Sequence, residues 1–223
     1  ELISLGRQHK LPVIDDVGSG ALVDFGKYGF EDEPQVSESI SAGADIVLFS
    51  GDKLVGGPQC GIIVGKKAWI SRLAKHPLMR AFRVDKLTLA ALVATLKLLG
   101  GPTELAEQKV PLLALLSTSQ QNLQNRAERL AEQIASSKLV ATAEAQTSVA
   151  YLGGGAIPTE GIDSWSVAIQ TTGISLNQLS QQLRERAPAI VGRIQQDRLI
   201  LDLRTMSPAE DRLVAEAFEN DAK

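Results

Sequence analysis

Two short apolar runs separated by one helical pattern place the tightest limit on how the first part of this chain folds. Residues 12–15 and 45–49 each have the pattern of a short strand, and the helical pattern of residues 34–40 lies between them. A strand, a helix and a second strand in this order favour parallel pairing, because the helix returns the chain to the starting end of the sheet. The unbroken apolar character of residues 45–49 is typical of a buried parallel strand. We therefore predict an α/β fold for residues 1–65, with residues 61–65 as another buried strand.

The remainder of the chain is first helical and then rich in strand patterns. Helical patterns cover residues 66–75, 85–99, 111–136, 176–186 and 208–219, and strand patterns cover residues 140–144, 149–152, 167–171, 190–195 and 199–203. Strands grouped with two helices on one side predict a small α+β domain. The sequence Gly100-Gly101-Pro102 breaks the chain, so we place a domain boundary between residues 1–108 and residues 109–223.

Composition excludes several other classes of protein. Of the 223 residues, 44% are hydrophobic and 22% are charged, which is the balance of an ordinary globular protein and not of a disordered chain. The formal net charge of −3 gives no overall electrostatic signature of nucleic-acid binding. The single cysteine, Cys60, favours a reducing compartment, so we expect a cytoplasmic protein. No apolar run approaches the roughly 18–20 residues of a membrane span, and we expect no membrane partner.

The first residues have the pattern of a helix that is already under way. The chain begins at Glu1, without a methionine, and the strand of residues 12–15 follows directly. A helix and a strand alone have little to pack against. We therefore expect the chain to be a C-terminal fragment of a longer protein.

Lys53 is the strongest candidate for a reactive side chain. It lies in the Gly-rich turn of residues 50–61, directly after the apolar strand of residues 45–49. In doubly wound folds, ligands bind at the carboxyl ends of parallel strands. Burial in such a crevice favours the neutral amine, which can attack a carbonyl carbon. A solvated loop lysine is the simplest alternative, and the small residues on both sides of Lys53 argue against it because they leave room for a flat ligand.

Asp16 is the second candidate, because it ends the strand that we expect to pair beside the one before Lys53. A carboxylate at that edge can pair with a protonated pyridine nitrogen. Asp15 competes for this role, since successive side chains of a strand point to opposite faces. A turn-capping role for Asp16 is a further alternative. Ser50 can donate to a phosphate group, although serine in a Gly-rich turn more often only forms the turn.

Arg80 and Arg83 lie three residues apart in a helical pattern. On one helix face they would clamp an anion with several donors, and two solvated arginines explain the spacing equally well. His9, His76 and Cys60 match no metal-ligand spacing, so we predict no metal site. We interpret Cys60 as a small buried residue rather than a nucleophile.

Together these motifs resemble the bacterial selenocysteine synthases, the family of L-seryl-tRNA(Sec) selenium transferases. Residues 50–59, followed by residues 61–67, are the most specific part of the resemblance. It also covers residues 16–20, 76–92, 153–159, 190–194 and 201–204, and so spans nearly the whole chain. Cys60 departs from the pattern, in which we expect a smaller residue such as alanine.

The resemblance implies a fold-type-I pyridoxal-phosphate-dependent transferase, similar in fold to aspartate aminotransferase. Residues 1–108 would be the C-terminal part of its large cofactor-binding domain, and residues 109–223 its small α+β domain. Lys53 would hold pyridoxal 5′-phosphate as an internal aldimine, and Asp16 would face the pyridine nitrogen. The family's phosphate-binding loop and its tRNA-binding domain would precede this chain.

The implied reaction converts L-seryl-tRNA(Sec) to L-selenocysteinyl-tRNA(Sec) through an aminoacrylyl intermediate. Lys53 would remove the α proton, and Arg80 and Arg83 would bind selenophosphate, the selenium donor. The family also implies a homo-oligomer. Two alternatives stay open: another fold-type-I lyase that acts on a small amino acid, and a non-catalytic paralogue. The presence of both Lys53 and Asp16 argues against the second.

Overall fold

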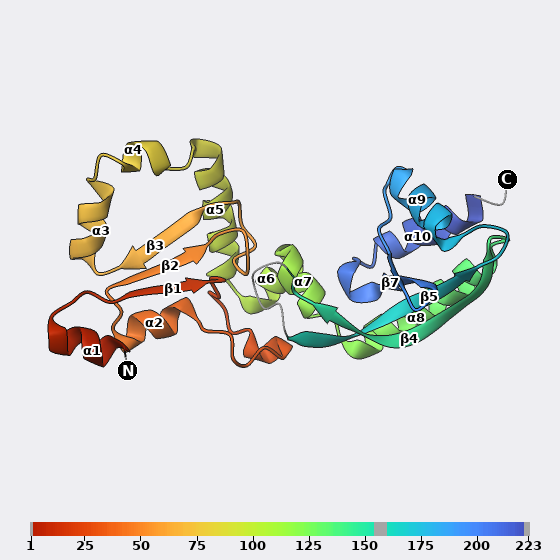
Figure 1. The fold of residues 1–223 in the computed structure, drawn as a ribbon, viewed down its shortest axis with the longest axis horizontal. Helices are drawn as coiled ribbons and strands as arrows, with labels where there is room; N and C mark the ends of the chain where they lie inside the picture. The colour runs from red at the N-terminus through yellow and green to blue at the C-terminus, as the bar shows by residue number, and fades with distance from the viewer. Residues whose placement is uncertain (1, 154–159, 221–223) are drawn as a thin grey trace. The chain divides into compact units, whose positions relative to one another are not determined.

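The structure is a computed structural model that describes residues 2–153 and 160–220 (Figure 1). The chain divides into two compact units: the first comprises the residues up to Ala114 together with Leu152, Gly153 and Glu160, and the second comprises Leu115–Tyr151 and the residues from Gly161 onward. The division of the chain into a cofactor domain over residues 1–108 and a small domain over residues 109–223 stays a prediction. No helix within the described ranges is both long and apolar enough to cross a membrane.

The first unit contains a three-stranded sheet in the order β1-β2-β3. Strand β1 (Ile14–Gly18) pairs in parallel with β2 (Ile46–Ser50), and helix α2 (Val36–Ala42) lies between them in the chain. This confirms the predicted parallel α/β unit. Strand β3 (Gly61–Gly65) pairs with β2 in the antiparallel direction. The expectation that β3 is buried was wrong, because β3 is an edge strand and Ile63 remains 43% exposed.

Helices surround this sheet, and their ends follow the signals in the sequence. Gly43 ends α2 with a left-handed φ of 106°, and the Asp85 carboxylate caps α5 by accepting hydrogen bonds from two backbone N–H groups. The core of the sheet is formed by Val47, Phe49 and Val55. The other helical elements of the first unit are α1 (Leu2–His9), the 3₁₀ helix η1 (Gly26–Tyr28), α3 (Lys67–Ala74), α4 (Met79–Phe82), α5 (Lys86–Leu99) and α6 (Thr103–Lys109).

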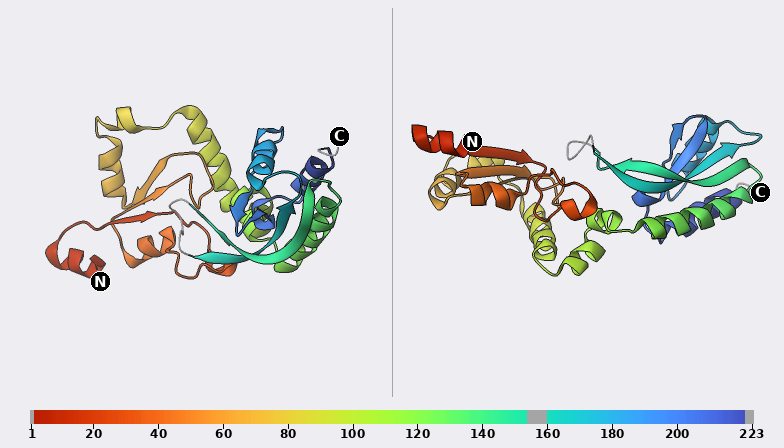
Figure 2. Two further views of the ribbon diagram at one scale, coloured as in Figure 1. Left: turned by 45° about the vertical axis from the view of Figure 1, so that its right-hand side comes forward. Right: turned by 90° about the horizontal axis from the view of Figure 1, so that it is seen from below.

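The second unit is a four-stranded antiparallel sheet in the order β4-β5-β7-β6. Its strands are β4 (Val140–Tyr151), β5 (Gly161–Thr171), β6 (Arg193–Gln195) and β7 (Arg198–Asp202). Helices α8 (Gln120–Ala135), α9 (Leu176–Glu185) and α10 (Glu210–Asn220) share one hydrophobic core with a single face of this sheet. Figure 2 shows α8 running along one side of β4 and β5. The predicted α+β architecture is therefore present, with β4 as one strand where the sequence suggested two.

A buried arginine explains why the predicted helix of residues 111–136 is interrupted. Arg204, in the 3₁₀ helix η2 (Leu203–Thr205), is 5% exposed. Its guanidinium donates to the carbonyl oxygens of Leu115 and Leu116 at 3.1 and 3.2 Å, where α7 (Pro111–Leu116) ends. The last carbonyl groups of a helix lack partners within the helix, and the guanidinium supplies those partners where α7 stops.

The same guanidinium connects the start of α8 to the sheet. It donates to the carbonyl oxygen of Thr118 at 3.1 Å and twice to that of Asp163, at 2.8 and 3.0 Å. Ser119 then caps α8 by accepting a hydrogen bond from Asn122 N. Burial lowers the pKa of Arg204, and the charges of Asp202 and Asp163 oppose this shift.

We expect Arg204→Met to lower the free energy of unfolding by about 3 kcal/mol, because the carbonyl groups that it binds lose a charged donor in a buried setting. Denaturant unfolding followed by circular dichroism measures this change. Arg212, 85% exposed on α10, provides the matched control, and Arg212→Met should change stability by less than about 0.5 kcal/mol. Equal losses in the two variants would contradict the role of Arg204.

Candidate active site

The parallel pairing of β1 and β2 brings the segments of Asp16 and Lys53 to one edge of the first sheet. Asp16 lies opposite Leu48 in the register, and β2 ends at Ser50, just before the turn that carries Lys53. Beyond the strands, Leu54 N donates to the carbonyl oxygen of Ser19 at 3.1 Å. The loop after β1 and the turn after β2 are therefore joined through their main chains.

The two aspartates of β1 have different surroundings. The hydroxyl of Ser39, on α2, donates to Asp15 Oδ2 at 2.6 Å. Asp16 points to the opposite face and is exposed. Asp15 thus already accepts a hydrogen bond from α2, whereas Asp16 is exposed and available to a ligand. Sequence alone left this choice open.

The residues that follow Lys53 are buried, whereas the Lys53 side chain is only half-buried. Leu54 and Val55, which follow Lys53, are 2% and 0% exposed. Lys53 itself is half-buried, and within the described residues its Nζ atom has no hydrogen-bond or ion-pair partner. Ser50 is half-buried as well. A lysine amine of this kind can react with a carbonyl compound that enters the site.

Close packing explains the small residues in the turn of Lys53. Gly51 N donates to the carbonyl oxygen of Cys60 at 2.8 Å, and Gly57 N donates to that of Gly51 at 2.8 Å. A Cβ atom at Gly51 would overlap Cys60 Sγ and lie 3.0 Å from the Pro58 carbonyl oxygen. The turn therefore requires glycine at position 51 once cysteine is present at position 60.

Arg80 lies in helix α4 and Arg83 is the residue that ends it, so their common helix face stays a prediction. Helix α4 contains only four residues, and Arg83 follows it with an extended ψ of 138°. Both arginines are exposed. Among the described residues, no hydrogen bond or ion pair joins either of them to Asp16, Ser50 or Lys53.

Two residues of the site region were missed by the sequence analysis. Ser19 is 5% exposed, and its hydroxyl donates to Glu33 Oε1. Because the Ser19 carbonyl oxygen accepts from Leu54 N, this pair fixes the loop between Asp16 and Lys53. The Gly18-Ser19-Gly20 sequence was the available signal, since a serine between two glycines of positive φ (71° and 79°) marks a tightly shaped loop.

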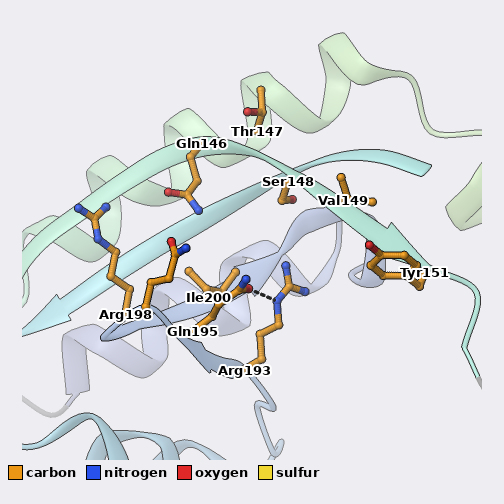
Figure 3. Close-up of a pocket in the computed structure, with 10 residues that line it drawn as sticks. Gln146, Thr147, Ser148, Val149, Tyr151, Arg193, Gln195, Arg198 and Ile200 are labelled. Atoms are coloured by element: carbon orange, nitrogen blue, oxygen red, sulfur yellow. Dashed lines mark hydrogen bonds between the residues drawn. The ribbon is translucent and has the colours of Figure 1, made fainter. Parts of the chain in front are cut away.

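A second polar region lies in the second unit, where a hollow of about 890 Å³ is lined by side chains from residues 146–151 and 193–200 (Figure 3). We call it the polar hollow. The sequence analysis singled out only Arg193 among its residues, as part of a family motif. Of the Gly-rich motif of residues 153–159, residues 154–159 lie outside the described part of the chain.

Asp16, within β1, and Lys53, after β2, lie in a chain whose α/β and α+β units have the fold of the fold-type-I pyridoxal-phosphate enzymes. The solved structure of D-glucosaminate-6-phosphate ammonia-lyase has this fold and matches 99% of the chain with a TM-score of 0.56, at 23% identity and over 51% of its own length. Within this class, the chain belongs to the family of the L-seryl-tRNA selenium transferases (SelA), whose family model matches residues 1–207.

Proteins named L-seryl-tRNA(Sec) selenium transferase are close relatives over nearly the whole chain. The one from Alkaliphilus oremlandii is 45% identical over 98% of the chain. Those from Carboxydothermus hydrogenoformans and Hyphomonas neptunium are 42% and 43% identical over 94% and 98% of it. The chain spans slightly less than half the length of these relatives: 46%, 45% and 47%.

We expect Gly51→Ala to lower the free energy of unfolding by about 1–3 kcal/mol, because the added methyl group overlaps Cys60 Sγ. Adding Cys60→Ala should recover part of the loss. Gly61→Ala is the matched control, since nothing lies within 4 Å of a Cβ atom there. Denaturant unfolding of these three variants and of Cys60→Ala alone measures the coupling, and strictly additive effects of the two substitutions would contradict it.

Cys60 should react with iodoacetamide at pH 8 more slowly than a cysteine whose thiol has an ordinary pKa. Burial, and next the charge of Asp52, raise the pKa of the thiol, while a hydrogen bond from Gly51 opposes the shift. A raised pKa leaves less thiolate at a given pH. Asp52→Asn should therefore speed alkylation, by less than about tenfold because burial is the larger cause. An alkylation rate that Asp52→Asn leaves unchanged would contradict this account.

Proposed function

We propose that the protein to which this chain belongs converts L-seryl-tRNA(Sec) to L-selenocysteinyl-tRNA(Sec), with pyridoxal phosphate as cofactor and selenophosphate as selenium donor. The observation that carries the proposal is the half-buried Lys53 amine, without a partner among the described residues, on a turn that is bonded to the loop of Asp16. The names of the relatives support the same substrate.

The residues present fit pyridoxal phosphate. Lys53 offers an amine for its aldehyde group, Asp16 offers a carboxylate for its pyridine nitrogen, and Ser50 offers a hydroxyl to its phosphate. Gly51 and Gly57 face other parts of the chain and allow the close packing of the turn that presents Lys53. When bound, the cofactor supplies an electron sink for the carbanion that forms at the α carbon of the substrate.

In this proposal each residue has a separate task. The Lys53 amine removes the proton from the α carbon of the seryl group. Asp16 keeps the ring nitrogen protonated by holding a proton between its carboxylate and that nitrogen. The seryl hydroxyl leaves the β carbon as water, the selenium of selenophosphate bonds to that carbon, and a water molecule cleaves the phosphorus–selenium bond to release phosphate. Arg80 and Arg83 hold the phosphate of the donor, for which their exposed guanidinium groups are available.

We further propose that the protein works as a homo-oligomer in the cytoplasm, where charged tRNA is used. Helix α5 supports an assembly, because none of its residues is buried and it exposes apolar side chains. Leu89, Val93 and Leu96, spaced four and three residues apart on one side of the helix, are 49%, 49% and 38% exposed. An apolar helix face of this kind is typical of an interface.

We expect Lys53→Ala in the full-length protein to abolish the visible absorbance of the lysine-bound cofactor and to reduce selenocysteinyl-tRNA formation by about 10²–10⁴-fold. Asp16→Asn should keep Lys53 bound to the cofactor and lower the rate. Lys75→Ala, at an exposed position after α3, is the control. Retention of both the absorbance and the turnover by Lys53→Ala would contradict the proposal.

The same assay separates the alternative lyase activity. We expect turnover of seryl-tRNA(Sec) with selenophosphate and none of free serine. Elimination from free serine without need of tRNA would favour a lyase that acts on a small amino acid.

A further inference from the structure

The loop between β1 and α2 (residues 19–35) folds back onto its own beginning. Val36 N donates to the carbonyl oxygen of Ala21 at 3.0 Å, so the end of the loop lies beside its start. We call residues 19–21 and 33–36 the neck of the loop. Compact loops whose ends lie close together frequently contribute to function.

One side-chain hydrogen bond crosses the neck. The hydroxyl of Ser19, which is 5% exposed, donates to Oε1 of the half-buried Glu33. A carboxylate is a stronger acceptor than a neutral group, and partial burial strengthens the bond further. The same hydroxyl lies 3.3 Å from the carbonyl oxygen of Val17, which is a second acceptor within its own turn. Removal of the Glu33 carboxylate would therefore release the neck without leaving the buried hydroxyl unpaired.

The neck contacts the turn of Lys53 directly. Leu54 N donates to the carbonyl oxygen of Ser19 at 3.1 Å, and Leu54 is 2% exposed. Gly20, with a φ of 79°, approaches the end of β2 so closely that a Cβ atom there would lie 2.9 Å from the carbonyl oxygen of Ser50. Ser19 is thus bonded through its side chain to the other side of the neck and through its carbonyl group to the residue after Lys53.

Ser19 is also close in the chain to Asp16. Ser19 N donates to the carbonyl oxygen of Val17 at 2.8 Å, which makes a tight turn directly after Asp16. The position of the Lys53 turn relative to Asp16 therefore depends on where Ser19 is held. A displacement of about 1 Å in a reacting group can lower a rate by about 10²-fold.

The start of α2 does not account for Glu33. Gln35 and Glu38 form the capping box of that helix, so its first N–H groups already have side-chain partners. Within the part of the chain that the structure describes, Glu33 also forms no ion pair. The contact that the carboxylate makes here is its bond with Ser19.

We propose that Glu33 is a positioning residue for Lys53. Its carboxylate holds the Ser19 hydroxyl, and Ser19 holds the Leu54 N–H group and with it the turn that presents the Lys53 amine beside Asp16. Glu33 acts through Ser19 and not on the substrate. The inference rests on the proposed function for the reaction that Lys53 performs.

The first test is hydrogen–deuterium exchange of the full-length protein without cofactor, followed by mass spectrometry of overlapping peptides. We expect Glu33→Ala to speed exchange of the Leu54 amide by about tenfold or more, because the acceptor of that amide is no longer held. The amides of Gly51 and Gly57 bond to carbonyl groups within the turn and should exchange within about twofold of the wild-type rate. Glu33→Gln keeps an acceptor oxygen and should restore most of the protection.

The second test measures selenocysteinyl-tRNA formation by the same variants with cofactor. We expect Glu33→Ala to lower kcat by about 10–100-fold and to leave KM for seryl-tRNA(Sec) within about threefold of the wild type. Glu33→Gln should recover kcat to within about threefold. Glu31→Ala is the matched control, because it removes the same charge from an exposed position of the same loop. It should change kcat and Leu54 exchange by less than about twofold.

Ser19→Ala tests whether Glu33 acts through Ser19. If it does, adding Glu33→Ala to Ser19→Ala should lower kcat by less than about twofold further. Should Glu33→Ala fail to fold, Ser19→Ala alone decides: faster Leu54 exchange together with a lower kcat supports the proposal, and unchanged values contradict it.

Four results would overturn the proposal. They are unchanged Leu54 exchange in Glu33→Ala, an unchanged kcat despite faster exchange, effects of Ser19→Ala and Glu33→Ala that multiply, and an effect of Glu31→Ala as large as that of Glu33→Ala. The last result would mean that the charge of the loop matters and not the bond with Ser19.

Failure of the proposed function gives a different pattern. If the wild type forms no selenocysteinyl-tRNA, the proposed function fails, while faster Leu54 exchange in Glu33→Ala still supports the positioning of the Lys53 turn by Glu33. If the wild type turns over and Glu33→Ala leaves Leu54 exchange unchanged, the positioning role fails and the proposed function stands.

Discussion

The candidate active site depends on the parallel pairing of β1 and β2. A parallel pair ends both strands at the same edge of the sheet, and here one strand ends near a carboxylate while the other leads into the turn of a lysine. The bond from Leu54 N to the Ser19 carbonyl oxygen then extends this pairing past the strands into the loops. With β2 antiparallel to β1, the lysine turn would lie at the opposite end of the sheet, and the two groups could not serve one ligand.

The sequence was sufficient for the parts of the site that depend on local patterns. The apolar runs of β1 and β2, with a helix between them, predict parallel strands, and the position of Lys53 after β2 follows from them. The sequence could not decide between Asp15 and Asp16, because the difference depends on the hydrogen bond that Ser39 of α2 donates to Asp15. The end of α4 after four residues could not be predicted either, because no clear signal in the sequence marks it.

Long-range contacts account for the misjudged elements of the second unit. Arg204 binds carbonyl groups of residues nearly ninety positions earlier and so ends α7, where the local pattern continues as a helix. Strand β4 was divided in two because Gln146-Thr147-Ser148 resembles a polar break. In the structure these residues continue the strand, and Gln146 and Ser148 line the polar hollow.

The link between the two loops of the active site joins main-chain atoms only. Every residue has a carbonyl group, and every residue except proline has an N–H group. This link itself therefore places no requirement on the side chains at positions 19 and 54, although the Ser19 hydroxyl separately holds its loop through Glu33. Descendants of one ancestral enzyme can in this way acquire new substrates by altering the walls of the site, with the lysine and the aspartate still held in the same mutual position.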